Sequence, residues 1–219
     1  MVQAAIRAFV NSYRIDLSKS KKTKFNSLNE MFTREIKKDF NLISEDSFIH
    51  PVEGELVSYG RVKSGQTFLI KGKNYCVEEL IGEKEDLEDH YFYNYYLSPQ
   101  DYHRVHHPVS GKFIFTKEIK GPLYPVAPWF VKLVPSVFAK NYRTVSKVIS
   151  DTQGPVYTIM VGALNVGSLK MIEGLFKDET KFVKSGDPLG IFEMGSSVVV
   201  FCEKELQVQE GPVFFEKII

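Results

Sequence analysis

The hydrophobic residues follow one spacing near the N-terminus and a different one further along the chain. Near the N-terminus they recur at steps of three and four, which predicts a helix over residues 3–17 with one apolar face. The residues of that face are Ile6, Phe9, Val10, Tyr13 and Leu17. A second, short helix is predicted over residues 26–37. The first apolar face needs a cover, and both the body of the protein and a membrane surface are open interpretations.

After residue 48, short β-branched and aromatic runs alternate with glycine-containing turns. This pattern is typical of a compact β-sandwich or barrel, and helical segments are too few to cover a parallel sheet. The predicted strands are 55–59, 67–70, 91–97, 112–117, 144–149, 156–161, 189–192 and 197–202. We therefore expect a mostly β (α+β) fold, with a helical N-terminal arm over residues 1–48 and a β-sandwich- or barrel-like domain over residues 49–219.

The segment 123–139 is apolar but contains three prolines, so a continuous helix is not expected there. An apolar stretch of this length is either a core segment or a flap over an apolar ligand. Both interpretations stay open at this stage.

Composition and charge narrow the range of partners. Lys and Arg total 28 against 27 acidic residues, so no overall field favours nucleic acid. Four of the lysines fall in residues 18–24, where each could add about 1 kcal/mol of attraction to anionic lipid. We expect neither a secretory signal nor a membrane-spanning helix, since the chain lacks the apolar runs that both require. Cys76 and Cys202 are far apart and weakly indicate a reducing compartment.

Three histidines, His103, His106 and His107, fall within five residues. Imidazole is the side chain suited to proton transfer near neutral pH, which makes these residues candidate acids or bases. A zinc site is the alternative, although HxxH alone is a weak signal and no further ligand stands at a zinc spacing. A second candidate is Gly195-Ser196-Ser197, between two hydrophobic strands. It is either a plain turn or a peptide bond open to attack by the neighbouring hydroxyl.

Taken together, these stretches resemble the phosphatidylserine decarboxylase family in seven blocks that keep the family's order. They look like its elements FFxR, PxDG, KGxxYxxxxLLG, LxPxDYHRxHxP, NER, VGAxxVGS and GxxxGxFxxGS(T/S)V. In this sequence the blocks are FNSLNEMFTR (25–34), HPVEG (50–54), IKGKNY with ELIG (70–82), LSPQDYHRVHHP (97–108), NYR (141–143), VGALNVGS (161–168) and GDPLGIFEMGSSVV (186–199).

The resemblance implies a proenzyme that cleaves itself between Gly195 and Ser196. Ser196 would become a pyruvoyl group, the electron-accepting cofactor that no natural side chain supplies. His106 matches the base that takes the Ser196 proton, Glu53 the acid that orients it, and His103 the histidine of the decarboxylation step. No metal is implied, and the substrate-binding residues are not identified.

Two positions depart from the family pattern. Glu53 stands where the family has Asp, and the longer side chain displaces the carboxylate by about 1 Å, a shift that can matter about a hundredfold in rate. Tyr142 replaces the Glu of the NER element, which puts a local salt bridge in doubt.

The implied function is decarboxylation of phosphatidylserine to phosphatidylethanolamine and CO2. The implied setting is peripheral, on an anionic membrane at the cytoplasmic face of the cell membrane, with a homodimer as one possible assembly. The alternatives are an unprocessed family member that acts as a lipid-binding module, and a zinc-dependent hydrolase that uses the histidines of residues 103–107. A lipoyl or biotinyl carrier is a further alternative, but Gly195-Ser196 offers no lysine to modify.

Overall fold

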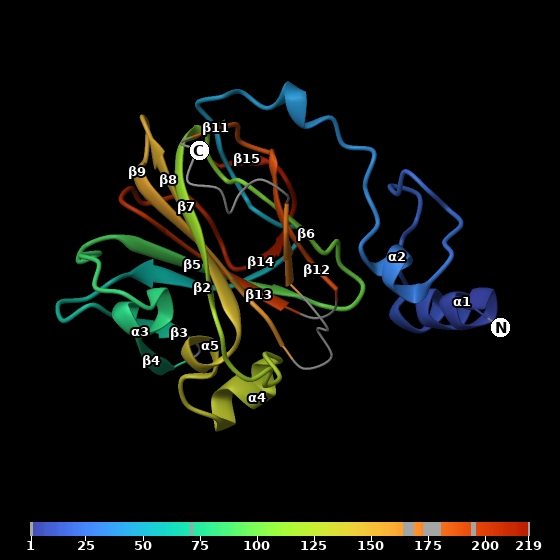
Figure 1. Ribbon diagram of the computed structural model, residues 1–219, viewed down its shortest axis with the longest axis horizontal. Helices are drawn as coiled ribbons and strands as arrows, with labels where there is room; N and C mark the ends of the chain where they lie inside the picture. The colour runs from blue at the N-terminus through green and yellow to red at the C-terminus, as the bar shows by residue number, and fades with distance from the viewer. Residues whose placement is uncertain (1, 71, 164–168, 173–180, 194–195, 219) are drawn as a thin grey trace.

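The computed structural model describes residues 2–70, 72–163, 169–172, 181–193 and 196–218 (Figure 1). In this part of the chain strands far exceed helices, and the paired strands run antiparallel. The predicted mostly β, α+β fold is therefore confirmed.

One large sheet organises the molecule. Its eight strands lie in the order β11-β7-β8-β9-β13-β5-β2-β14. Their bounds are β2 Gly54–Arg61, β5 Tyr91–Leu97, β7 Gly111–Ile119, β8 Arg143–Ser150, β9 Gly154–Val161, β11 Phe182–Val183, β13 Ser196–Cys202 and β14 Gly211–Val213. All but the two short edge strands, β11 and β14, were predicted to within about two residues at each end.

The central strand β13 shows why this sheet needs a cover on each face. Its side chains alternate, so Val198 and Val200 belong to one hydrophobic cluster and Val199 and Phe201 to another. All four are fully buried. A continuous apolar run is what a strand buried on both faces requires.

The first cover is a small sheet with the order β10-β12-β6. These strands are β6 Arg104–His106, β10 Leu169–Met171 and β12 Pro188–Phe192. Val105, Leu189 and Phe192 pack from this sheet into the cluster that contains Val198 and Val200. The histidine segment therefore lies in the layer that covers one face of the large sheet.

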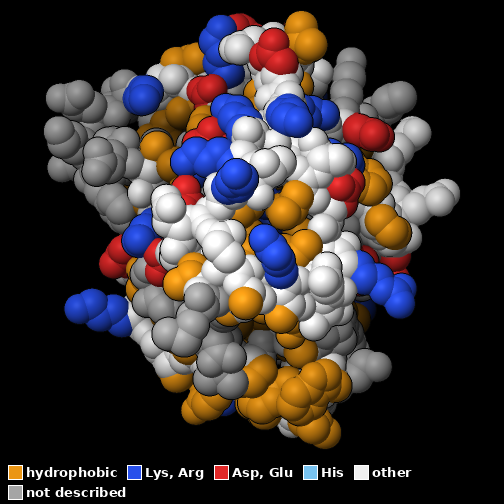
Figure 2. All heavy atoms as spheres, turned by 90° about the vertical axis from the view of Figure 1, so that its right-hand side faces the viewer, with side chains coloured by type: hydrophobic (Ala, Val, Ile, Leu, Met, Phe, Trp, Pro, Cys, Tyr) orange, Lys and Arg blue, Asp and Glu red, His pale blue; other side chains and the backbone are white. Residues whose placement is uncertain are grey.

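The second cover combines a hairpin and three short helices. Its elements are β3 Thr67–Ile70, β4 Lys73–Cys76, α3 Val77–Ile81, α4 Pro128–Leu133 and α5 Val137–Lys140. Segment 123–139 serves in part as core, since Val131 and Phe138 are buried against the sheet. Trp129 and Leu133 of α4 are 63% and 73% exposed. Figure 2 shows hydrophobic side chains gathered at the lower end of the molecule, where Figure 1 places α4.

The N-terminal arm runs along one side of the molecule and then over its upper end (Figure 1). It contains α1 Val2–Tyr13, α2 Leu28–Phe32 and the 3-10 turn η1 Phe40–Leu42, and β1 Phe48–Ile49 then pairs with β15 Lys217–Ile218. Both helices are shorter than predicted. The chain leaves α1 at Arg14, which has a φ of 52°, and Thr33 caps α2. The apolar face of α1 is covered by the arm itself, because Ile6 clusters with Phe25 and Met31.

Candidate active site

The segment between β5 and β6 carries His103 and is closed by a tight turn; His106 ends β6 and His107 follows it. The Asp101 carboxylate accepts a hydrogen bond from the backbone N–H of Ser98 at 2.7 Å. Burial raises the pKa of this carboxyl group to about 6. The turn brings the chain from the end of β5 into β6, which pairs with β12.

His103 is fully buried and has a fixed tautomer. Its Nδ1 lies 2.9 Å from the backbone oxygen of Asp101, and a carbonyl oxygen only accepts, so Nδ1 carries the proton. Nε2 therefore presents a lone pair, and it has no hydrogen-bond partner among the described residues. The ring of Phe32 from α2 covers the imidazole, with ring centroids 4.0 Å apart. Burial lowers the pKa of His103 to about 3, so the ring is neutral at pH 7.

The backbone holds His103 beside the segment that was predicted to be cleaved. The N–H of Phe192, the last residue of β12, donates to the His103 carbonyl at 2.9 Å. At the other end of the connection, Ser196 pairs with Leu97 as β13 begins. Gly195 lies outside the described residues, and only the backbone of Ser196 is described. Both ends of the connection between β12 and β13 are thus fixed to the stretch of chain that carries His103.

His106 is buried at the other end of the small sheet, opposite Pro188. Pro188 stands four residues before Phe192 on β12. At the usual rise per strand residue, His106 is therefore roughly 13 Å from the Phe192 end of this strand. The ring donates from Nδ1 to the Gly186 carbonyl at 2.7 Å and accepts at Nε2 from the Tyr102 hydroxyl at 3.2 Å. Phe40 of η1 stacks on it, and burial lowers its pKa to about 4.

Glu53 stands directly before β2 and is half-buried. It lines an open cavity of about 620 Å³ together with Lys19, Lys37 and Lys38. Burial raises the pKa of its carboxyl group, and the nearby lysines oppose that shift. Among the described residues, Glu53 is not a hydrogen-bond partner of His106, whose two ring nitrogens already have other partners. The structure therefore does not show the predicted Glu53–His106 contact.

Glu53 does lie on the same side of the sheet end as Ser196. A Cβ atom added to the next residue, Gly54, would lie 2.7 Å from the Tyr96 carbonyl oxygen and 3.5 Å from the Leu97 Cγ. Because Leu97 pairs with Ser196, Glu53 and Ser196 flank the end of β5, about two strand spacings (roughly 10 Å) apart. Gly54 is also required here, since a larger residue would push the two strands apart.

Sequence reasoning did not single out three residues that the structure adds to this site: Arg34, Asp101 and Tyr102. Tyr102 is 4% exposed and supplies the donor to His106. Asp101 fixes the tautomer of His103 through its backbone carbonyl. Arg34 is 7% exposed and donates to the Gln100 carbonyl at 3.1 Å. All three residues lie inside the sequence blocks that resemble the family. Their place in these blocks was the only feature of the sequence that could have identified them.

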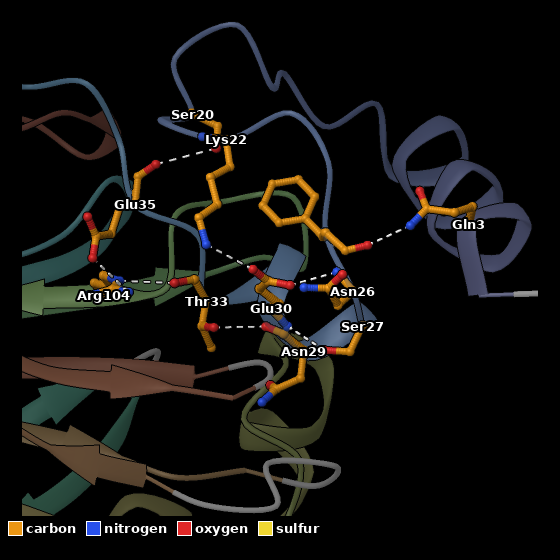
Figure 3. A network of polar contacts seen from close by, with 11 residues as sticks. Gln3, Ser20, Lys22, Asn26, Ser27, Asn29, Glu30, Thr33, Glu35 and Arg104 are labelled. Carbon is orange, nitrogen blue, oxygen red and sulfur yellow. Dashed lines mark hydrogen bonds and ion pairs between the residues drawn. The ribbon is translucent and has the colours of Figure 1, made fainter.

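The arm contributes directly to the site through α2. Ser27 caps the helix by accepting from the Glu30 N–H, and the Thr33 carbonyl accepts from Arg104, the residue after His103 (Figure 3). Asn29 donates to the Glu193 carboxylate at 3.1 Å, just before the predicted cleavage bond. The α2 region therefore contacts both Arg104 of β6, through Thr33, and Glu193 after β12, through Asn29.

His107 differs from the other two histidines in its surroundings. It is buried, packs edge-on against Phe113 of the large sheet, and burial lowers its pKa to about 3. Among the described residues, no group of three or more His, Cys, Asp or Glu side chains is arranged to hold a metal ion. The zinc alternative gains no support from this arrangement.

No helix in the described part of the chain has the length and apolar character that membrane crossing demands. Cys76 and Cys202 are both free thiols.

Comparisons with known proteins give a consistent result. The family model described as phosphatidylserine decarboxylase matches residues 28–215. A phosphatidylserine decarboxylase proenzyme of Psychromonas ingrahamii is 33% identical, over 91% of this chain and 78% of that protein. Proenzymes of the same name from Vibrio parahaemolyticus and Acinetobacter baumannii are 32% and 34% identical, over 94% and 92% of this chain and 81% and 77% of theirs. These matches confirm the family predicted from the seven blocks and, with it, the prediction of a carboxy-lyase. The chain belongs to the phosphatidylserine decarboxylase family.

Proposed function

We propose that this protein decarboxylates phosphatidylserine to phosphatidylethanolamine and CO2, using a pyruvoyl group that it makes from Ser196. The observation that carries the proposal is the position of His103. A buried, neutral imidazole with an unpartnered Nε2 lies against the last residue of β12, where the chain enters the connection to Ser196. A buried polar atom without a partner is costly, which favours a role for it in the reaction.

Self-cleavage proceeds as an acyl shift followed by elimination. The Ser196 hydroxyl oxygen attacks the Gly195 carbonyl carbon, its proton passes to a base, and the C–N bond breaks to leave an ester. Loss of the Ser196 Cα proton then breaks the ester C–O bond and frees the Gly195 carboxylate. Water finally replaces the nitrogen, which leaves as ammonia, and a pyruvoyl group remains at residue 196. The chain would divide into fragments 1–195 and 196–219.

His106 is the proposed base of this first step, and Tyr102 connects it to the site. Because Nδ1 carries the proton, the basic Nε2 of His106 faces the Tyr102 hydroxyl. In this proposal the Ser196 hydroxyl gives its proton to the Tyr102 hydroxyl, which passes its own proton to His106. Burial raises the pKa of the Tyr102 hydroxyl; among the nearby charges, Arg104 and Arg34 lower it, while Glu35 and Glu53 raise it. We assign Glu53 an electrostatic role on Tyr102 in place of the predicted direct contact with His106.

The residues around the connection fit a pyruvoyl group at position 196. The ketone, when present, supplies the electron acceptor that decarboxylation of an amino acid needs. The protein supplies, at the buried His103 Nε2, a site for the proton that replaces the carboxylate. This nitrogen carries no proton in the neutral ring, so it takes one from water and passes it to the substrate carbon. Since burial disfavours a charged imidazole, the transfer to carbon is favoured.

We infer that the α4 end of the molecule meets the lipid surface. Trp129 and Leu133 of α4 are exposed, as is Tyr124 at 41%, and the rings of Tyr124 and Trp129 both pack on Phe130. Exposed aromatic and leucine side chains on a short helix are suited to the headgroup region of a bilayer. Peripheral attachment is consistent with the lipid substrate; the cytoplasmic face and the homodimer stay predictions.

Intact mass under denaturing conditions, combined with CO2 release from phosphatidylserine, tests the function. We expect two fragments, the smaller beginning at a blocked residue 196, together with CO2 release. Ser196→Ala should give one uncleaved chain without activity, whereas Ser197→Ala should still be cleaved. A folded wild-type chain that stays whole and releases no CO2 would rule out the decarboxylase and favour the lipid-binding alternative.

Flotation with phosphatidylserine vesicles tests the lipid surface separately. Replacing Trp129 and Leu133 together by serine should reduce the fraction that floats, while replacing the exposed Leu42, at 84% exposure on the opposite end, should not. Equal flotation of the two variants would remove α4 from the proposal.

A further inference from the structure

Arg34 is a buried cation whose hydrogen-bonding capacity is not used. It is 7% exposed, and Nη2 donates to the Gln100 carbonyl at 3.1 Å. Nη1 is buried and has no hydrogen-bond partner among the described residues. Burial lowers the pKa of the guanidinium, so the site bears an electrostatic cost that a partner anion would relieve.

The cavity beside Arg34 has room for a small anion. It has a volume of about 190 Å³ and is lined by the end of α2, by the lysine run and by Arg104. The other cations that line it already have partners in the structure. Lys22 pairs with Glu30 at 3.1 Å, and Lys21 and Arg104 both pair with Glu35 (Figure 3 shows the Lys22 and Arg104 contacts). Among the described residues, Arg34 is thus the cation lining this cavity that has no carboxylate partner and has a buried donor without an acceptor.

A purely structural role leaves the free donor of Arg34 unexplained. Asp101 is the strongest counter-charge to Arg34, but the described hydrogen bond of its carboxylate goes to the Ser98 N–H. The other deeply buried arginine, Arg143, shows what a structural arginine looks like in this protein. Its three guanidinium nitrogens donate to the carbonyls of Leu80, Asn141 and Glu79 at 2.6, 3.0 and 2.6 Å.

We propose that Arg34 binds the phosphate of the substrate headgroup. The inference rests on the proposed function. Arg34 also lies close to His103: its Nη2 donates to the carbonyl of Gln100, three residues before His103, and Phe32, two residues before Arg34, packs on the His103 ring. Phosphate is favoured over the substrate carboxylate because a cation on the carboxylate would stabilise a charge that the reaction removes. A cation on the unreacting phosphate holds the headgroup without that penalty.

The kinetic test uses monomeric dihexanoylphosphatidylserine, so that vesicle binding plays no part. Arg34→Gln should raise KM by about 10- to 100-fold and leave kcat within about threefold, the effect of losing charge-assisted hydrogen bonds to an unreacting group. Arg34→Lys should recover part of the loss. Arg7→Gln, which removes the same charge from the exposed face of α1, should match the wild type. Thermal melting and intact mass verify that each variant is folded and cleaved.

A binding experiment separates the phosphate from the carboxylate and does not need turnover. Dihexanoylphosphatidylglycerol has the phosphate but no carboxylate, and N-hexanoylserine has the carboxylate but no phosphate. By equilibrium dialysis, Arg34→Gln should weaken binding of the first about tenfold or more and leave the second unchanged.

Weakening of N-hexanoylserine alone, or of neither compound, would overturn the proposal. So would a loss of kcat at constant KM in the kinetic test. If the wild type proves uncleaved and inactive, the decarboxylase proposal fails, yet dialysis still decides whether Arg34 holds a phosphate.

Discussion

The two covers of the large sheet bury different kinds of side chain. The cover built from β3, β4 and α3–α5 is almost wholly apolar, and the cation buried beneath it, Arg143 of β8, has its donors satisfied by three carbonyls. The cover built from β6, β10, β12 and the arm buries three histidines. Within its described part, two imidazole nitrogens, on His103 and His107, and one guanidinium nitrogen, on Arg34, lack partners. In the described part of the apolar cover the corresponding atom is a single neutral one, the Tyr75 hydroxyl oxygen.

This difference indicates how the fold combines stability with chemistry. Satisfied buried groups cost little and rigidify the structure, whereas unsatisfied ones are destabilising and persist where a ligand or a reacting group completes them. The apolar cover of β3, β4 and α3–α5 therefore supplies stability, while the cover that contains the histidines is less stable and holds the site. Each prediction below compares a change in one cover with a matched change elsewhere.

Replacing His103 should have the largest effect. His103→Gln removes the proposed proton carrier, so kcat for CO2 release should fall by about 10²- to 10⁴-fold, the usual contribution of a general acid or base. Self-cleavage, measured by intact mass, should still occur, because that step is assigned to His106. His107→Gln is the control: His107 is equally buried but packs on Phe113, so its loss should change stability more than kcat. Equal losses of kcat in both variants would contradict the assignment.

The two buried arginines give the next comparison. Arg143→Met leaves three buried carbonyl oxygens without their donors and should lower the free energy of unfolding by about 3–5 kcal/mol. Arg34→Met removes one hydrogen bond together with an uncompensated charge, so its cost should be no more than about 1 kcal/mol. Urea denaturation with unchanged slopes measures both values. Similar losses would mean that Arg34 is as structural as Arg143.

Acidification should weaken the histidine cover first. Burial lowers the pKa of His106 to about 4 and those of His103 and His107 to about 3, against about 6.5 in the unfolded chain. Below pH 6.5 the histidines therefore bind protons in the unfolded state but not in the folded state. As a result, the free energy of unfolding falls by up to about 1.4 kcal/mol per pH unit for each histidine. This stability is fully present above pH 6.5 and is lost towards pH 3–4.

The carboxyl groups of Asp101 and Glu53 oppose this trend, because burial raises the pKa of both. The pKa of Asp101 is raised to about 6, so the folded state takes up this proton earlier than the unfolded state does and gains stability between about pH 6 and 4. With three histidines against these two carboxyl groups, we still expect a net loss of about 1.4 kcal/mol or more per pH unit in that window. Amide hydrogen exchange at pH 4.5 should rise in β6 and β12 before it rises in β3, β4 and α3. Uniform exchange across both covers would argue against a local origin.

The sequence allowed the sheet to be predicted better than the site. Runs such as residues 198–201 are β-branched and aromatic throughout, so local propensity and burial agree. The helix predicted over residues 26–37 was wrong in length, since α2 ends at Phe32, where Thr33 turns its hydroxyl back to the Asn29 carbonyl. Such a cap depends on side-chain geometry that apolar spacing does not report.

The candidate site residues were predicted only within the sequence blocks that resemble the family. His103 and His106 were identified, but their partners are set by tertiary packing. Arg34 donates a hydrogen bond to the Gln100 carbonyl, 66 positions further along the chain, and the His106 Nδ1 donates to the Gly186 carbonyl, 80 positions further along. The pairing of His106 with Glu53 was expected from the family pattern, and the structure instead shows Tyr102 as the hydrogen-bond partner. Neither periodicity nor spacing along the chain specifies contacts of this kind.

Replacing Tyr102, the proposed link between His106 and the rest of the site, should have the smallest effect. Tyr102→Phe keeps the buried ring but leaves Nε2 of His106 without its donor, so self-cleavage should slow about three- to tenfold, the worth of roughly one hydrogen bond. The measurement is the rate at which the full-length chain disappears by intact mass. Tyr75→Phe, a buried tyrosine of the other cover, should cleave at the wild-type rate. Faster cleavage of Tyr102→Phe would mean that the hydroxyl blocks His106 rather than serving it, and the proton would then pass from Ser196 to His106 by another route.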